Sequence, residues 1–85
     1  MTGMFARSKA GHDKNKTYVI LKEEDGYVFL ADGIRKTIEN PKKKKLKHIQ
    51  PIIENFDVEL VNRIEQKQLI QNEEIKRAIR KHGGL

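Results

Sequence analysis

The sequence contains no cysteine, so it offers neither a disulfide framework nor a thiolate metal site. This fits a reducing compartment such as the cytoplasm. No apolar run approaches the roughly 20 residues that a membrane-spanning helix needs. Residues 1–10 also lack an apolar stretch of signal-peptide length. We therefore expect a soluble, cytoplasmic protein without a membrane partner.

Residues that commonly carry enzymatic chemistry are also sparse. The chain has one serine, Ser8, which lies in a predicted strand without an evident base partner. No Gly-rich phosphate loop, nucleophile elbow or metal-ligand pattern occurs. The histidines His12, His48 and His82 lack the spacing of zinc ligands. We expect no catalytic activity, no cofactor, no metal and no small-molecule substrate.

The excess positive charge lies entirely in the first half of the chain. Residues 1–50 hold 12 Lys and Arg against 6 Asp and Glu, whereas residues 51–85 hold 6 of each, which accounts for the net charge of +6. Within residues 35–48, seven basic side chains accompany only Glu39. Such a concentration is typical of a protein that binds a polyanion. The neutral second half favours a structural or protein-facing role.

Apolar patterns predict a mainly β fold for the first half. The expected strands cover residues 4–9, 17–21, 27–31 and 46–50. Turns are expected over residues 11–16 and at Asp25-Gly26, and Pro51 limits the last strand or places it at an edge. The two middle strands are almost continuously apolar. This favours strands buried in a small closed barrel over a sheet with one buried face.

Helical spacing replaces strand patterns after Phe56. Residues 58–66 and 73–82 are predicted to form two short helices, with Asp57 and Asn72 as N-caps. One longer helix with a kink near residues 68–71 is the alternative. We divide the chain into a barrel, residues 1–52, and a helical extension, residues 53–85, that packs on the barrel or contacts a protein neighbour.

The order of residues in the first half resembles a known family. The segment from Arg7 to Lys16, followed by Tyr18-Val19-Ile20, resembles the KOW motif, which is a strand, a Gly-containing basic turn and a return strand. Residues 28–33 (VFLADG) and 45–49 (KLKHI) look like the L-fourteen-e type of large-subunit ribosomal protein and its relatives. The resemblance covers about residues 4–52. Asn15 stands where the family usually has a second glycine, and asparagine tolerates positive φ.

This resemblance implies an SH3-like barrel of the KOW type that binds RNA. With the charge pattern, it predicts a ribosome-associated protein whose basic barrel surface docks on structured ribosomal RNA through shape and phosphates. The expected RNA-binding residues are basic: Arg7, Lys9, His12, Lys14, Lys16, Arg35, Lys36, Lys42, Lys43, Lys44, Lys45, Lys47 and His48. A protein-interaction adaptor or a transcription-linked KOW factor is the alternative.

Several residue roles remain open between two interpretations. The run Lys42–Lys45 would present more lysines to phosphates as a flexible loop than as a strand, where alternate side chains point to opposite faces. His48 is expected either to contact RNA or to be partly buried. Most aromatic side chains are expected in the core, with Tyr18 as the candidate for an exposed ring beside the basic turn. Asp13 and Asp32-Gly33 are interpreted as turn residues.

Overall fold

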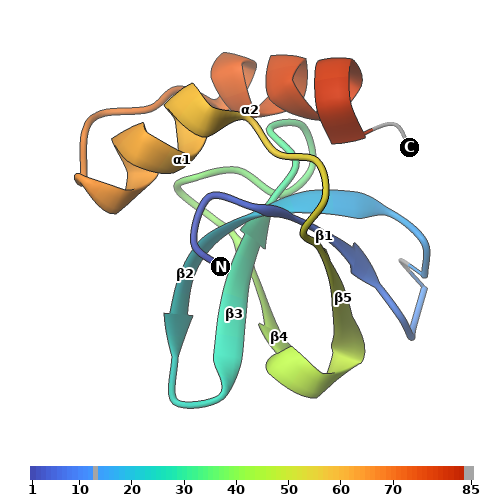
Figure 1. Cartoon of the computed structure of the whole chain (residues 1–85). Helices are drawn as coiled ribbons and strands as arrows, with labels where there is room; N and C mark the ends of the chain where they lie inside the picture. Colours follow the sequence, from blue (N-terminus) through green and yellow to red (C-terminus); the bar gives the residue numbers. More distant parts are fainter. Residues whose placement is uncertain (13, 84–85) are drawn as a thin grey trace.

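The computed structural model describes residues 1–12 and 14–83, so Asp13, Gly84 and Leu85 lie outside the described residues. Five strands precede the helices (Figure 1). The strands are β1 (Phe5–Ser8), β2 (Thr17–Glu24), β3 (Tyr27–Ala31), β4 (Lys42–Lys45) and β5 (Ile49–Ile52). The helical elements are the 3₁₀ helix η1 (Leu46–His48), α1 (Val58–Glu65), α2 (Asn72–Ala78) and the π-helical turn η2 (Ile79–Gly83). The predicted β-rich fold with C-terminal helices is confirmed.

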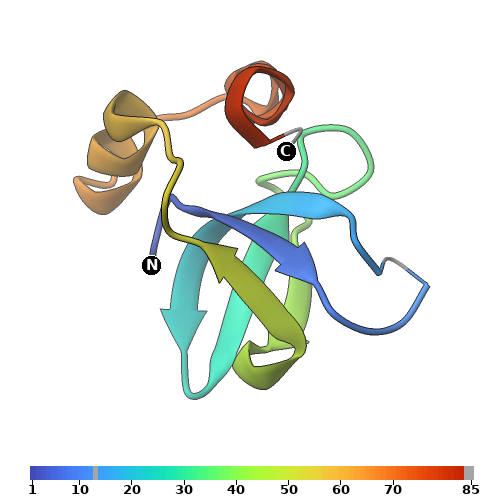
Figure 2. The same cartoon turned by 45° about the vertical axis from the view of Figure 1, so that its right-hand side comes forward.

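The strands form one antiparallel sheet in the order β4-β3-β2-β1-β5. In the described part of the chain, β4 and β5 are the two edges and do not pair with each other, so the expectation of a closed barrel is wrong. Only the three residues of η1 separate β4 from β5. The two edges therefore approach each other at η1, and the sheet is open but strongly curled (Figure 2).

Each face of the sheet carries a buried cluster, which explains the almost continuous apolar runs of β2 and β3. The concave face carries a cluster of Ala6, Tyr18, Ile20, Val28, Leu30 and Ile49. On the other face the helices lie over one end of the sheet (Figure 1). The cluster there consists of Phe5, Val19, Ala31, Ile52, Leu60, Ile75 and Ala78. The helices thus bury part of the second face of the sheet, so closure into a barrel is not needed to explain the buried residues there.

The hairpin between β2 and β3 forms where the sequence predicted it. Asp25 and Gly26 both have positive φ, 53° and 81°, as a type I′ turn requires. The lysine run is the strand β4, which pairs with β3. The last strand begins at Ile49 because residues 46–48 form η1, and Pro51 lies in the edge strand β5, as expected.

Two helices form, as predicted, in place of one kinked helix. Asp57 caps α1, because its carboxylate accepts a hydrogen bond from the backbone N–H of Leu60 at 3.1 Å. The expected cap at Asn72 is wrong: Gln71 precedes α2, and its backbone N–H donates to the Glu74 carboxylate at 2.8 Å. None of the helices among the described residues is long and apolar enough to span a bilayer.

The Asn72 side chain instead links α2 to the connection between β3 and β4. Its amide oxygen accepts a hydrogen bond from the backbone N–H of Ile38 at 2.8 Å, and its amide nitrogen donates to Glu39 at 2.8 Å. The hydrogen bond from Asn72 is the main reason that the pKa of Glu39 is below its ordinary value.

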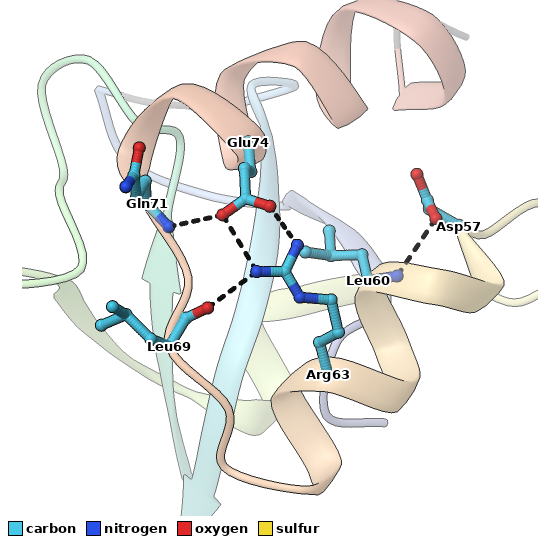
Figure 3. A network of polar contacts seen from close by, with 6 residues as sticks. All are labelled: Asp57, Leu60, Arg63, Leu69, Gln71 and Glu74. Carbon is cyan, nitrogen blue, oxygen red and sulfur yellow. Dashed lines mark hydrogen bonds and ion pairs between the residues drawn. The ribbon is translucent and has the colours of Figure 1, made fainter.

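A polar network fixes α1 against the start of α2 (Figure 3). The guanidinium of Arg63 pairs with the carboxylate of Glu74 and donates to the backbone oxygen of Leu69 at 2.8 Å. The hydrogen bond from Arg63 is the largest cause of the lowered pKa of Glu74, followed by the backbone hydrogen bond from Gln71. The network holds the two short helices as a pair over the sheet.

Glycine allows the helices to approach the sheet closely at two points. Gly33 (φ 82°) lies against the start of α2, where a Cβ would come within 2.4 Å of the carbonyl oxygen of Asn72. Gly3 (φ 87°) lies against α1, where a Cβ would come within 2.7 Å of the Cα of Val61. Both positions combine positive φ with close contact, so each favours glycine for two independent reasons.

Candidate nucleic-acid interface

The basic turn between β1 and β2, residues 9–16, projects away from the sheet (Figure 2). Four of its basic side chains are exposed: Lys9, His12, Lys14 and Lys16. Gly11 (φ 89°) and Asn15 (φ 71°) have the positive φ that the turn was predicted to need. Asp13, interpreted as a turn former, lies outside the described residues. The described residues of the turn, 9–12 and 14–16, therefore display these four side chains to solvent.

Contacts at the start of this turn hold it beside β4 and η1. The backbone N–H of Lys9 donates to the carbonyl oxygen of His48 at 2.9 Å. The ammonium group of Lys44 donates to the hydroxyl of Ser8 at 2.6 Å and to the carbonyl oxygen of Ala10 at 2.8 Å. The structure thus brings Lys9 close to His48. It also gives Lys44 a structural role that the charge pattern alone did not predict.

The four lysines of β4 divide between the two faces of the sheet. Lys43 and Lys45 are exposed, whereas Lys42 and Lys44 are half-buried and share the concave side with Val28 and Leu30. The expected basic loop is therefore wrong: the lysine run is a strand, in which alternate side chains point to opposite faces. The outer face of the sheet, opposite the concave face, therefore carries two of the four lysines, Lys43 and Lys45.

A hollow lies at the Lys16 end of the basic turn. Its lining contains basic residues that were predicted to bind RNA and others that were not. It is lined by Lys16, Thr17, Asp32, Ile34, Arg35, Lys76, Ile79 and Arg80. The Asp32 carboxylate accepts hydrogen bonds from the backbone N–H groups of Ile34, Arg35 and Lys36 at 2.9 to 3.0 Å. Four basic side chains line the hollow with this one carboxylate, so its charge is net positive. The ammonium of Lys76 also lies 3.1 Å from the carboxylate of Glu73.

Lys76 and Arg80 were not among the predicted site residues, because the second half of the chain is neutral as a whole. Their spacing of four residues is a signal that could have identified them, since it places both on one helical face. Arg77 and Lys81 line a different hollow with Asp57, Glu59 and Glu74. The helical segment is thus neutral on average but has a basic side toward the turn.

Other predicted residues lie apart from this hollow. Arg7 pairs in register with Gln50 and lines a separate hollow with Pro51, Ile53 and neighbouring residues. Lys36 is half-buried, and its carbonyl oxygen accepts hydrogen bonds from the turn that begins at Asp32. Lys47 and His48 are both exposed on η1. The interpretation of His48 as a partly buried residue is therefore wrong.

The aromatic residues divide differently from the prediction. Tyr18, the candidate for an exposed ring, is only 3% exposed and belongs to the core. Phe5 is completely buried, as expected. Tyr27 and Phe29 are half-buried and lie on the outer face of β3, because they alternate with the buried Val28. Exposed aromatic surface is therefore found on β3 and at Phe56, whereas the ring of Tyr18 does not provide it beside the basic turn.

Comparison of the chain with protein-family models and with curated proteins finds no match. The interface is consequently interpreted from its geometry and charge. Its centre is the basic turn, residues 9–16. At one end of the turn, Lys16 lines the hollow together with Arg35, Lys76 and Arg80. At the other end, the backbone N–H of Lys9 donates a hydrogen bond to His48 of η1.

Proposed function

We propose that this protein is a non-catalytic RNA-binding protein that docks the basic turn on structured RNA. The observation that carries the proposal is the continuity of exposed cations from the turn through Lys16 to Arg35 and Arg80 in the hollow. Lysine and arginine side chains on such a surface contact phosphates and release counterions. Phosphate contacts position a protein without reading sequence, so recognition rests mainly on RNA shape.

The fold type supports the same proposal. β1 and β2 form an antiparallel pair on either side of the basic turn. This arrangement supports the resemblance of residues 7–20 to the KOW motif, which is a strand, a basic turn and a return strand. We propose that the curled, open sheet is of the SH3-like KOW type. Residues 28–33 and 45–49 resemble the L-fourteen-e type of large-subunit ribosomal protein. Together with the KOW type, this resemblance favours ribosomal RNA as the bound RNA.

A matched pair of triple variants tests the use of the turn. Lys9→Gln, Lys14→Gln and Lys16→Gln together remove three charges from the turn and are expected to weaken binding to a structured ribosomal RNA fragment at least tenfold. The control removes three charges from exposed positions in the C-terminal half, Lys67→Gln in the turn after α1 and Arg77→Gln and Lys81→Gln in the helical segment α2–η2. It is expected to change affinity much less. Equal losses would show that only total charge matters and would contradict docking through the turn.

A second candidate function is an adaptor that binds a protein partner. It is favoured by exposed apolar side chains in and beside the segment between β5 and α1: Ile53 at 67%, Phe56 at 42% and Val58 at 60% exposure. Sedimentation through a gradient with and without RNase separates the two. Comigration with the large ribosomal subunit that RNase abolishes supports ribosomal RNA binding. Comigration with a protein complex that survives RNase supports the adaptor.

A further inference from the structure

The outer face of the β2-β3-β4 sheet has an end that the helices do not cover. Ala31, at the end of β3, packs under the helices with Ile75 and Ala78. Tyr27 and Phe29 lie on the same face of β3 but toward the hairpin, and both rings remain partly exposed. An uncovered pair of rings on a regular strand forms a rigid surface.

Lysines surround these two rings through cross-strand pairing. Phe29 lies between Lys22 of β2 and Lys43 of β4 in the sheet register. The ammonium of Lys22 is 4.7 Å from the centroid of Phe29, and that of Lys43 is 4.5 Å from the centroid of Tyr27. Lys45 lies opposite Tyr27 on β4.

Charge on this face is mainly positive. Glu24 lies opposite Tyr27 on β2, and its carboxylate is 3.7 Å from the ammonium of Lys22. The surface therefore combines aromatic rings with more cations than anions, which suits a ligand that has flat rings and negative charge.

A shallow hollow continues this surface beyond Tyr27. It is lined by Gly26, Tyr27, Lys45, Leu46 and Lys47. Its wall is mostly apolar, and the two lysines supply its charge. Gly26 has no side chain to close the hollow, so the ring of Tyr27 is accessible from this side.

We propose that the outer face around Tyr27 and Phe29 binds unpaired nucleotides of single-stranded RNA. The bases stack on the two rings, and Lys22, Lys43 and Lys45 contact the phosphates. A lysine over an exposed ring is held only weakly, so its flexible side chain moves from the ring to a phosphate when a base arrives. Bases of a duplex are already stacked internally and do not reach this surface.

This inference rests on the proposed RNA binding and adds a second contact of different specificity. The basic turn contacts the backbone of structured RNA, whereas the Tyr27–Phe29 surface selects unpaired bases. Together they favour an RNA site in which a helix adjoins a loop or a single-stranded end.

The test compares two probes, an oligouridylate of about ten nucleotides and an RNA duplex of about 16 base pairs. The double variant Tyr27→Leu, Phe29→Leu is expected to lose at least about fivefold in affinity for the oligouridylate and to keep its affinity for the duplex. The pair Tyr27→Phe, Phe29→Tyr retains both rings and is expected to bind as the wild type does. Phe56→Leu removes an exposed ring elsewhere and serves as the control.

The wild-type protein supplies a second readout that does not depend on folding of the variants. In nuclear magnetic resonance spectra, the ring protons of Tyr27 and Phe29 are expected to shift upfield on addition of oligouridylate, while those of Phe56 stay in place. Unshifted rings, or equal losses for both probes, overturn the inference. Wild-type binding to the duplex alone also overturns it and leaves the proposed function standing. Binding to neither probe overturns both.

Discussion

The ammonium group of Lys44 reaches the hydroxyl of Ser8 at 2.6 Å and connects two strands that are not neighbours in the sheet. Ser8 is only 1% exposed, and its hydroxyl also donates to the carbonyl oxygen of Ala10 at 2.9 Å. Lys44 therefore bridges β4 to the end of β1 across the concave side. This contact helps to hold the curl where β4 and β5 leave the sheet open.

Replacing Lys44 by methionine is expected to lower the free energy of unfolding by roughly 1–3 kcal/mol, because a charge-assisted hydrogen bond to a buried hydroxyl is lost. Lys43→Met is the matched control, since the neighbouring side chain is exposed on the other face. Urea denaturation of both variants measures the difference. Equal stability of the two variants would contradict a structural role for the Lys44 bridge.

Gly33→Ala is expected to destabilise the protein more than Gly26→Ala does. The two glycines have nearly the same φ, 82° and 81°, so alanine pays about 1–2 kcal/mol of backbone strain at either position. Only at Gly33 does the added Cβ also meet the carbonyl oxygen of Asn72, whereas nothing lies within 4 Å at Gly26. Thermal denaturation of both variants isolates the contact with α2. A smaller loss at Gly33 would contradict this packing.

Acid is expected to weaken the attachment of α1 to α2. Since the pKa of Glu74 in the folded protein lies below its ordinary value of 4.5, the charged carboxylate stabilises the folded state. This stabilisation is complete above the pKa of the unfolded state and is lost as the pH falls through the lower folded-state pKa. The difference in unfolding free energy between wild type and Glu74→Gln should therefore shrink below about pH 4.5. A difference that stays constant from pH 7 to pH 3 would exclude this role.

The basic side chains of α2 and η2 are expected to contribute to RNA affinity separately from the basic turn. Lys76→Gln and Arg80→Gln together are expected to weaken binding to structured RNA, because both side chains line the hollow that contains Lys16. Arg77→Gln with Lys81→Gln removes the same charge from neighbouring positions that line a different hollow. Fluorescence anisotropy with labelled RNA compares the two pairs. Equal weakening would mean that the hollow is not part of the interface.

Local patterns predicted most elements of this fold. The β2–β3 hairpin follows from two β-branched, aromatic runs around Asp25-Gly26, and α1 follows from the Asp57 cap and its apolar face. The strand β4 could not be predicted in this way, because four lysines have little strand propensity. It forms through pairing with the buried strand β3.

Nonlocal contacts explain the remaining differences. Continuous apolar strands have two physical explanations, closure into a barrel or a helical cover, and only the contacts of Leu60 and Ile75 with the sheet distinguish them. The sequence predicts Asn72 as an N-cap, yet its side chain accepts a hydrogen bond from the backbone N–H of Ile38, which is distant in the sequence. The cations of the hollow come from three separate segments, so no local charge count brings Lys16, Arg35 and Arg80 together.

The most direct measurement of the central claim is the dissociation constant for structured RNA as a function of salt concentration, for the wild type and for the triple variant of Lys9, Lys14 and Lys16. Each lost phosphate contact reduces the slope of log affinity against log salt by about 0.7–0.9. We predict a steep slope for the wild type and a slope shallower by roughly two for the variant. Affinity that is insensitive to salt, or identical slopes for the two proteins, would contradict RNA binding through the basic turn.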